Sequence, residues 1–290
     1  MPEHFAAAAA LLPPGLRAAA LNEPQTRRAA CEELRLRLGH PPALRLPEGE
    51  RTFSETPLRP ADLAAVLEAA TGASLHAYGD QLCRGFVCAP GGVRVGVCGA
   101  AVCEGGRLRT IRGVSSLCLR VARPVPGAGR AVLPLLGGRS VLIAAPPGGG
   151  KTTFLRELVR SQSDAGVRIA LADERGELAG LSPEGVPGFD VGRCTDVLSG
   201  APKAEAALLL LRAMGPEVVA MDELGDEADA AAVAALVGCG VRVFATAHAA
   251  DLAALRARPV VRALLSRGAF DALVRIRGRG AQRVYEVETL

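Results

Sequence analysis

The chain has 290 residues, of which 49% are hydrophobic, and its 34 Lys and Arg residues against 30 Asp and Glu give a net charge of +4. This composition is typical of a folded globular protein and excludes a disordered, low-complexity chain. There is no Trp, with only 2 Tyr and 7 Phe, so the core must be aliphatic. Because base-stacking aromatics are scarce and the net charge is small, no nucleic-acid partner is expected.

No stretch of 18 or more apolar residues is present, so no transmembrane helix is expected. The first twelve residues contain an alanine run without a basic region before it, which is a poor signal peptide. A cytoplasmic location with reduced cysteines is therefore expected. Four cysteines have a C-x4-C-x9-C-x4-C spacing that is wide for structural zinc, and the favoured interpretation is small apolar fillers on a sheet, with zinc as the alternative. They are Cys83, Cys88, Cys98 and Cys103.

Residues 1–122 are expected to form a smaller α+β domain. A helix is expected over residues 60–70, where Leu63, Val66 and Leu67 share one face. Alternation in residues 34–38 predicts a strand, and glycine-rich turns separate further strand-like runs. These runs cover residues 85–89, 93–98, 107–111 and 117–121. Residues 123–138 are rich in Pro and Gly and are the expected linker.

Residues 139–290 alternate between strand and helix patterns, which predicts a parallel sheet covered by helices on both faces, an α/β fold. The expected strands span residues 140–144, 167–172, 217–221 and 241–245. The expected helices span residues 151–163, 203–214, 226–237 and 250–258.

The strongest motif follows the first of these strands. A glycine-rich loop enters a helix at Lys151, as in a phosphate-binding loop, where backbone N–H groups and the positive helix end surround an anion. Lys151 is expected to reach the β- and γ-phosphates of ATP, and Thr152 to bind Mg²⁺. The consensus has glycine where this chain has Ala145, which strains the loop if that position requires a positive φ. The expected nucleotide-binding residues are Pro147, Gly148, Gly149, Gly150, Lys151, Thr152 and Thr153.

A second motif is the apolar run 216–221 followed by Asp222 and Glu223, the Walker B pattern. Asp222 is expected to hold Mg²⁺ together with Thr152, and Glu223 to activate the attacking water as a general base. The alternative is a pair of acids that merely cap a strand. The only lysines of the chain are Lys151 and Lys203, and a compact ammonium suits the phosphate loop better than a planar guanidinium.

Two further groups follow strands and so are expected at the same sheet edge, where ligands bind in open α/β sheets. One is the acidic segment 173–177, in which Glu174 or Glu177 could act on water or Mg²⁺. The other is Thr246 with His248, either of which could sense the γ-phosphate. A solvated loop and a structural histidine are the respective alternatives.

Taken together, these motifs resemble the stage III sporulation protein AA family, over most of the chain. In the second half the resemblance rests on residues 173–180, 190–192, 195–198, 202–205, 212–217, 222–225 and 246–248. In the first half it rests on residues 34–39, 91–96, 111–112 and 115–117.

That family is similar to the ATPases of type II and type IV secretion and pilus systems. The resemblance implies a RecA-like P-loop domain that hydrolyses ATP with Mg²⁺, assembled as a ring that is expected to be a hexamer. It also implies an acidic box at Asp173 and Glu174 and a histidine box at His248. The expected place of action is the mother cell of a spore-forming bacterium, peripheral on the inner face of the membrane. The expected partners are membrane-embedded subunits of a channel complex between mother cell and forespore.

Three functions remain open from the sequence. The leading one is an ATPase that energises or assembles this secretion-like apparatus. The second is a scaffold that binds ATP, forms rings and recruits partners but barely hydrolyses. The third is a DNA-dependent motor of the RecA type, against which the low aromatic content and mild charge argue.

Overall fold

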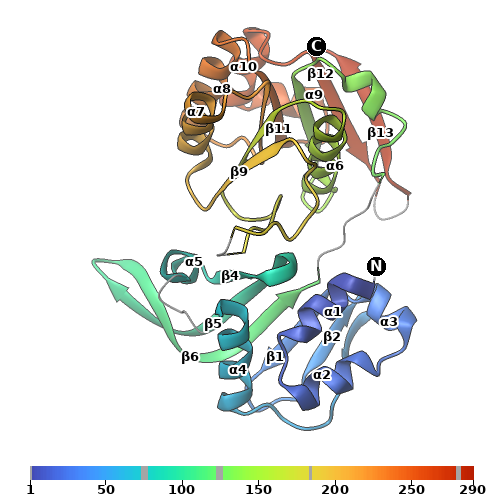
Figure 1. The fold of residues 1–290 in the computed structure, drawn as a ribbon, viewed down its shortest axis with the longest axis vertical. Helices are drawn as coiled ribbons and strands as arrows, with labels where there is room; N and C mark the ends of the chain where they lie inside the picture. Colours follow the sequence, from blue (N-terminus) through green and yellow to red (C-terminus); the bar gives the residue numbers. More distant parts are fainter. Residues whose placement is uncertain (1, 73–77, 122–126, 183–184, 279–281) are drawn as a thin grey trace. The chain divides into compact units, whose positions relative to one another are not determined.

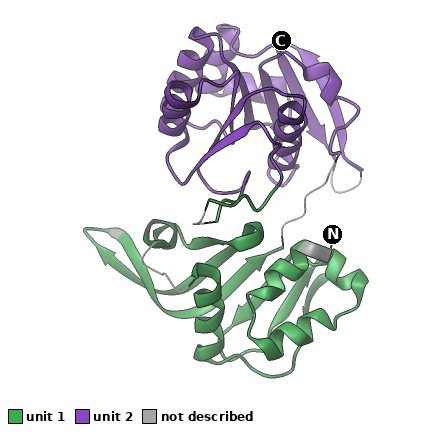
Figure 2. Cartoon of the chain, in the orientation of Figure 1, with its two compact units in different colours: residues 1–124, 180–189 green, residues 125–179, 190–290 purple. Residues whose placement is uncertain are grey.

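The computed structural model describes residues 2–72, 78–121, 127–182, 185–278 and 282–290 (Figure 1). The chain divides into two compact units, residues 1–124 with 180–189 and residues 125–179 with 190–290 (Figure 2). The boundary expected at residues 122–123 lies outside the described residues. Segment 180–189 groups with the first unit, whereas the sequence analysis places it in the second domain. Within the first unit, the Phe189 ring stacks on His4 with centroids 6.2 Å apart.

The first unit is built on an antiparallel sheet with the strand order β3-β2-β1-β6-β5-β4. Its longest part is the β5–β6 hairpin, in which Glu104 pairs with Arg107 across a two-residue turn. Gly105 and Gly106 occupy that turn with φ of 56° and 76°, the left-handed values that such turns require. The turn is confirmed; the two runs expected after it, 107–111 and 117–121, join into β6, the run 93–98 before it extends into β5, and the run 85–89 remains separate as β4. The strands are β1 (Glu33–Arg37), β2 (Ala43–Leu46), β3 (Gly49–Thr52), β4 (Phe86–Ala89), β5 (Val93–Glu104) and β6 (Arg107–Arg120).

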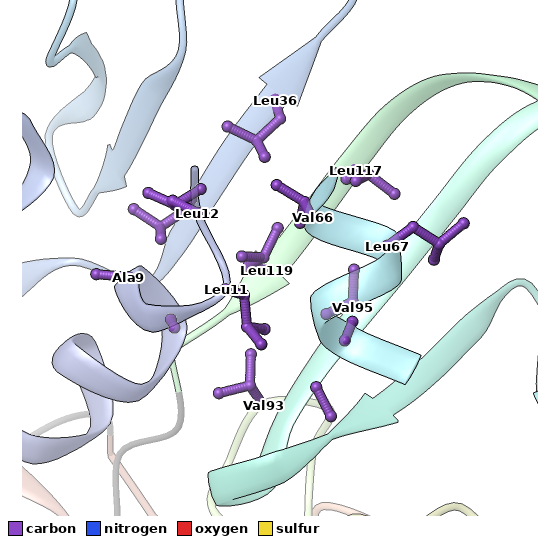
Figure 3. Packing of buried hydrophobic residues seen from close by; sticks show 14 of the residues in the cluster. Ala9, Leu11, Leu12, Leu36, Val66, Leu67, Val93, Val95, Leu117 and Leu119 are labelled. Carbon is purple, nitrogen blue, oxygen red and sulfur yellow. The ribbon is translucent and has the colours of Figure 1, made fainter. Parts of the chain in front are cut away.

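Aliphatic side chains form the core of this unit, as the composition requires. Leu36, Leu117 and Leu119 of the sheet pack with Leu12 and with Val66 of α4 (Figure 3). The expected helix over 60–70 is confirmed as α4, which buries Leu63 and Val66 and ends at Gly72 with φ of 55°. The helices are α1 (Pro2–Ala10), α2 (Pro14–Leu21), α3 (Gln25–Ala30), α4 (Pro60–Thr71) and α5 (Gly79–Cys83), with a 3₁₀ turn at Pro90–Gly92.

The second unit contains a sheet with the order β13-β12-β7-β11-β10-β8-β9, parallel throughout except for the β12–β13 pair. Four expected strands are confirmed as β7, β8, β10 and β11, and β9, β12 and β13 lie outside the four expected strand ranges. The strands are β7 (Val141–Ala145), β8 (Ile169–Asp173), β9 (Thr195–Ser199), β10 (Val218–Met221), β11 (Arg242–His248), β12 (Ala272–Arg277) and β13 (Val284–Thr289). The helices are α6 (Lys151–Asp164), α7 (Lys203–Met214), α8 (Glu227–Gly238), α9 (Leu252–Ala257) and α10 (Pro259–Ser266), with a 3₁₀ turn at Leu133–Leu136.

Both faces of this parallel sheet are covered. Alternate strand residues such as Leu142 and Val219 join one apolar cluster with side chains of α7, α8, α9 and α10. The intervening residues, such as Ile143 and Leu171, are equally buried, and α6 packs against β7 and β11. Helices on both faces leave the carboxyl ends of the strands as the open edge where a site can form.

A pH-dependent ion pair crosses the first sheet. Arg37 donates to both oxygens of Glu50, at 2.7 and 2.9 Å, and these hydrogen bonds outweigh burial and hold the pKa of Glu50 below 4.5. Both side chains are more than one-third exposed, so Glu50→Gln should cost only about 0.5 kcal/mol at neutral pH. Because the pKa of Glu50 is lower in the folded than in the unfolded chain, the ion pair stabilises the fold at a pH above the unfolded-state pKa. This stabilisation is lost as the pH falls through the folded-state pKa.

Urea unfolding of both proteins between about pH 7 and about pH 3 measures this effect. The difference between wild type and Glu50→Gln should shrink below about pH 4.5. A difference that persists unchanged at about pH 3 would contradict the assignment.

Candidate functional site

The loop between β7 and α6 has the backbone of an anion cradle. Gly148 and Gly150 have φ of 71° and 96°, which disfavour any side chain. Gly149 is restricted by space, because a Cβ there would lie 2.6 Å from the Cβ of Ala145. The three successive glycines thus allow the backbone to turn tightly before the first N–H groups of α6, the positive end of that helix.

Ala145 itself is unstrained. It is the last residue of β7, and among the described residues Glu223 is the one non-glycine residue with a positive φ. The strain considered for an alanine at this position is therefore absent. Its methyl group packs where Gly149 leaves room, so the departure from the consensus is accommodated by the neighbouring glycine.

Lys151 is only 6% exposed and folds back over the loop. Its Nζ donates to the carbonyl oxygens of Ala145 and Pro146, at 3.2 and 3.4 Å, and lies 2.8 Å from Nδ1 of His248. An ammonium has only donors, so Nδ1 accepts and Nε2–H of His248 donates to Glu223 Oε1 at 2.6 Å. Burial lowers the pKa of Lys151, and the charges of Asp222 and Glu223 offset part of this effect.

The carboxylate of Asp222 joins the start of α6 to the ends of β10 and β11. Its Oδ2 accepts a 2.8 Å hydrogen bond from the hydroxyl of Thr152, at the start of α6. Its Oδ1 accepts from the hydroxyl of Thr246 on β11, and that hydroxyl in turn accepts from the N–H of Glu223 at 2.8 Å. The two expected metal ligands, Thr152 and Asp222, are therefore in direct contact.

This pair suits Mg²⁺, which prefers hard oxygen ligands and usually takes one or two from protein. Within the described ranges, no group of three or more His, Cys, Asp or Glu side chains is arranged to hold a metal ion. A bound Mg²⁺ would therefore need phosphate oxygens and waters to complete its shell, as it does in nucleotide sites. The cysteines considered for zinc form no such group: Cys88 is buried on β4, while Cys98 and Cys103 are exposed on β5.

Glu223 is held between two basic side chains. Arg175 Nη1 lies 2.8 Å from Oε2, and His248 contacts the other oxygen. Burial raises the pKa of Glu223, but Arg175 and His248 outweigh it and leave the pKa below 4.5. The residue adopts φ of 57°, a conformation that costs about 1–3 kcal/mol in a non-glycine residue and that the Thr246 hydrogen bond helps to hold.

The acidic segment after β8 divides into a structural and an accessible part. Asp173 is 2% exposed, and its carboxylate accepts from the backbone N–H groups of Glu177, Leu178 and Ala179. Arg156 of α6 donates to the Leu178 carbonyl at 2.7 Å. Burial lowers the pKa of Arg156 to about 10, with Asp173 opposing the shift. Asp173 therefore shapes this loop, and its carboxylate is engaged by the loop's own amides.

Glu174 instead faces the site. Together with Asp222 and Glu223 it lines a cavity of about 20 Å³, which is room for about one water. Nζ of Lys203, on α7, lies 3.6 Å from Oε2 of Glu174 and 3.1 Å from Oδ2 of Asp229. The sequence marked Lys203 as one of two lysines but assigned it no place here; Arg175 was likewise missed, although it lies in the acidic segment. Of the other expected nucleotide-binding residues, Pro147 is exposed in the loop and Thr153 is half-buried in the first turn of α6.

Comparison with known proteins now identifies the family. The sequence model of the family described as "Sporulation stage III, protein AA" matches residues 8–285. The chain belongs to this family. The resemblance seen in the sequence is confirmed, and Stage III sporulation protein AA of Bacillus subtilis (strain 168) is 32% identical over 288 residues, 96% of this chain and 93% of that relative.

The match to a plant relative spans a smaller share of the relative's length. Protein SEEDLING PLASTID DEVELOPMENT 1 of Arabidopsis thaliana is 27% identical over 218 residues, 74% of this sporulation stage III protein AA family member but only 30% of the plant protein. The segment that matches this chain is therefore a minor part of the plant protein.

Solved structures show the fold. The pilus retraction motor PilT, solved with bound ADP, matches 90% of this chain and 79% of its own, with a TM-score of 0.62 and 18% identity. The ATPase DotB of Legionella pneumophila matches 90% and 76%, with a TM-score of 0.56 and 15% identity. The expected α/β P-loop fold with a smaller N-terminal domain is thus confirmed. In the described part of the chain, every helix is too short or too polar to cross a bilayer.

The loop role of Asp173 predicts a stability effect. Asp173→Ala leaves three buried or half-buried amides without their acceptor, so the free energy of unfolding should fall by about 3 kcal/mol. Glu174→Gln, one residue away and one-third exposed, is the matched control and should change it by less than about 1 kcal/mol. Denaturant unfolding measures both, and equal losses would refute the division of roles.

Proposed function

We propose that this protein is a Mg²⁺-dependent ATP hydrolase that energises or assembles the channel complex between mother cell and forespore. The observation that carries the proposal is the 2.8 Å hydrogen bond between Thr152 and Asp222 beside the glycine loop. It joins the two oxygen ligands of a Mg²⁺ site to the helix end that attracts phosphate. Family membership supports the sporulation context.

The chain's residues divide the work of phosphate binding. The N–H groups of residues 148–153 surround the β-phosphate, and Lys151 turns from the loop carbonyls to the β- and γ-phosphates. Its ammonium is already at the loop, so a side-chain rotation brings it to the nucleotide. Thr152 and Asp222 would hold Mg²⁺, and the chemistry that the ion would supply is neutralisation of charge on the transferred phosphoryl group.

Glu223 is the proposed general base, with Glu174 as the alternative. When Lys151 leaves Nδ1 of His248 for the phosphates, this nitrogen can take a proton from solvent and donate a hydrogen bond to the γ-phosphate, while Nε2–H continues to donate to Glu223. His248 then senses the nucleotide and transmits its presence to Glu223 through the 2.6 Å contact. A carboxylate with a pKa kept low by Arg175 and His248 is ionised at neutral pH, which is the state needed to accept a proton from water.

The scaffold function is retained as the second candidate because Glu223 is engaged by two basic side chains. A base held in this way needs release before it can act, so nucleotide binding without turnover is the outcome if release fails. In either case the proposed assembly is a ring, expected to be a hexamer. It is proposed to lie peripherally on the cytoplasmic face of the membrane, with membrane-embedded channel subunits as partners.

Phosphate release from ATP by the purified protein tests the hydrolase. Lys151→Ala should lower turnover at least about a hundredfold, because the variant loses the ammonium that stabilises the charge on the γ-phosphate in the transition state. Turnover per subunit should rise with protein concentration if the active form is a ring. Folded protein that binds ATP but shows no turnover at any concentration would support the scaffold, and folded protein that binds no nucleotide would refute both.

Paired amide variants separate the two candidate bases. Glu223→Gln should reduce turnover about a hundredfold or more while ATP binding persists, because the amide cannot accept the proton. Glu174→Gln should stay within about fivefold of wild type. The reverse order of effects in single-turnover measurements would assign the base to Glu174.

A further inference from the structure

Arg283 lies against the glycine loop from the C-terminal hairpin. It immediately precedes β13, and a Cβ placed on Gly150 would come within 2.8 Å of both Nε and Cζ of its guanidinium. Gly150 is therefore required twice, for its φ of 96° and for the room that the guanidinium takes. The close approach places a full positive charge beside the first turn of α6.

In the described part of the chain, this guanidinium has no counter-charge. Within the described residues Arg283 forms no ion pair, and its Nε is buried without a hydrogen-bond partner. The other described arginines of the hairpin are paired: Arg275 with Glu286 and Glu288, and Arg277 with Glu286 at 3.4 Å. A cation next to the positive end of a helix is electrostatically unfavourable, and a buried polar group without a partner adds to the cost. An anion held by the loop would reverse both effects.

The sheet order indicates which part of the nucleotide Arg283 meets. Asp222, Glu223 and His248 follow β10 and β11, on one side of β7, whereas β12 and β13 lie on the other side. Arg283 thus approaches the loop from the side opposite the proposed Mg²⁺ and water positions. Because the γ-phosphate must lie near the proposed Mg²⁺ and water positions, an arginine on the opposite side would meet the phosphates common to ADP and ATP.

We propose that Arg283 is a phosphate-binding residue that contacts the diphosphate of a bound nucleoside di- or triphosphate from the same subunit. The inference rests on the proposed nucleotide site and adds to it a ligand from outside the glycine loop. A second contact holds the C-terminal hairpin against α6 and so keeps Arg283 beside the loop. The aromatic rings of Phe154 on α6 and Tyr285 on β13 lie 5.1 Å apart.

Isothermal titration with ADP and with Mg·ATP tests this role in the full chain. Arg283→Gln should weaken both nucleotides about tenfold, the loss expected for one charge-assisted hydrogen bond. Without nucleotide its melting temperature should equal or exceed that of wild type, because an unpaired charge has been removed from the positive helix end. Arg277→Gln, on the same hairpin but paired with Glu286, should leave both affinities unchanged.

The outcomes are distinguishable. If wild type binds neither nucleotide, the proposed function itself fails. If wild type binds both and Arg283→Gln binds them equally well, only the present inference is overturned. A lower melting temperature of nucleotide-free Arg283→Gln would assign the residue a structural role instead, and a loss confined to ATP would refute the contact with the diphosphate.

Discussion

The contacts of the Asp222 carboxylate are the constraint on which the site depends. Thr152, Thr246 and, through Thr246, the backbone of Glu223 are all fixed by this one group. These residues come from the start of α6 and the ends of β10 and β11, so the carboxylate sets the spacing of the phosphate loop against the rest of the sheet edge. Both hydroxyl groups that it contacts belong to threonines, Thr152 and Thr246. The branched Cβ of threonine restricts the χ1 rotamer, so these hydroxyls are held in place.

A continuous chain of polar contacts extends from this centre through Lys151, His248, Glu223 and Arg175. Lys151 and Arg175 are the cations at its two ends, Nδ1 of His248 offers Lys151 a lone pair, and the Glu223 carboxylate lies between His248 and Arg175. A nucleotide that binds the Lys151 ammonium would remove it from His248 and so change the charge that surrounds His248 and Glu223. In this arrangement the occupancy of the phosphate loop and the state of Glu223 are coupled through two side chains.

The sequence was sufficient for the parts of this site that follow from local pattern. An apolar strand, three glycines and Lys151 define a loop and a helix start, and strand-terminal acids must share one edge of a parallel sheet. The sequence could not distinguish the roles of the adjacent acids Asp173 and Glu174. The Asp173 carboxylate accepts hydrogen bonds from the backbone amides of its own loop, whereas Glu174 lines the cavity. Sequence reasoning also gave no strand bounds for β12 and β13, because arginines and glutamates interrupt their apolar pattern, although β12 is largely buried between β13 and β7.

Both lysines of the chain are withdrawn from solvent: Lys151 is 6% exposed, and the side chain of Lys203 is 15% exposed beside Glu174 and Asp229. With the remaining basic positions occupied by arginine, the surface offers amine-directed chemistry no side-chain target. A reagent that acylates a lysine of this protein therefore modifies the neighbourhood of the phosphate loop. The extent of such labelling would act as a chemical gauge of how open that neighbourhood is.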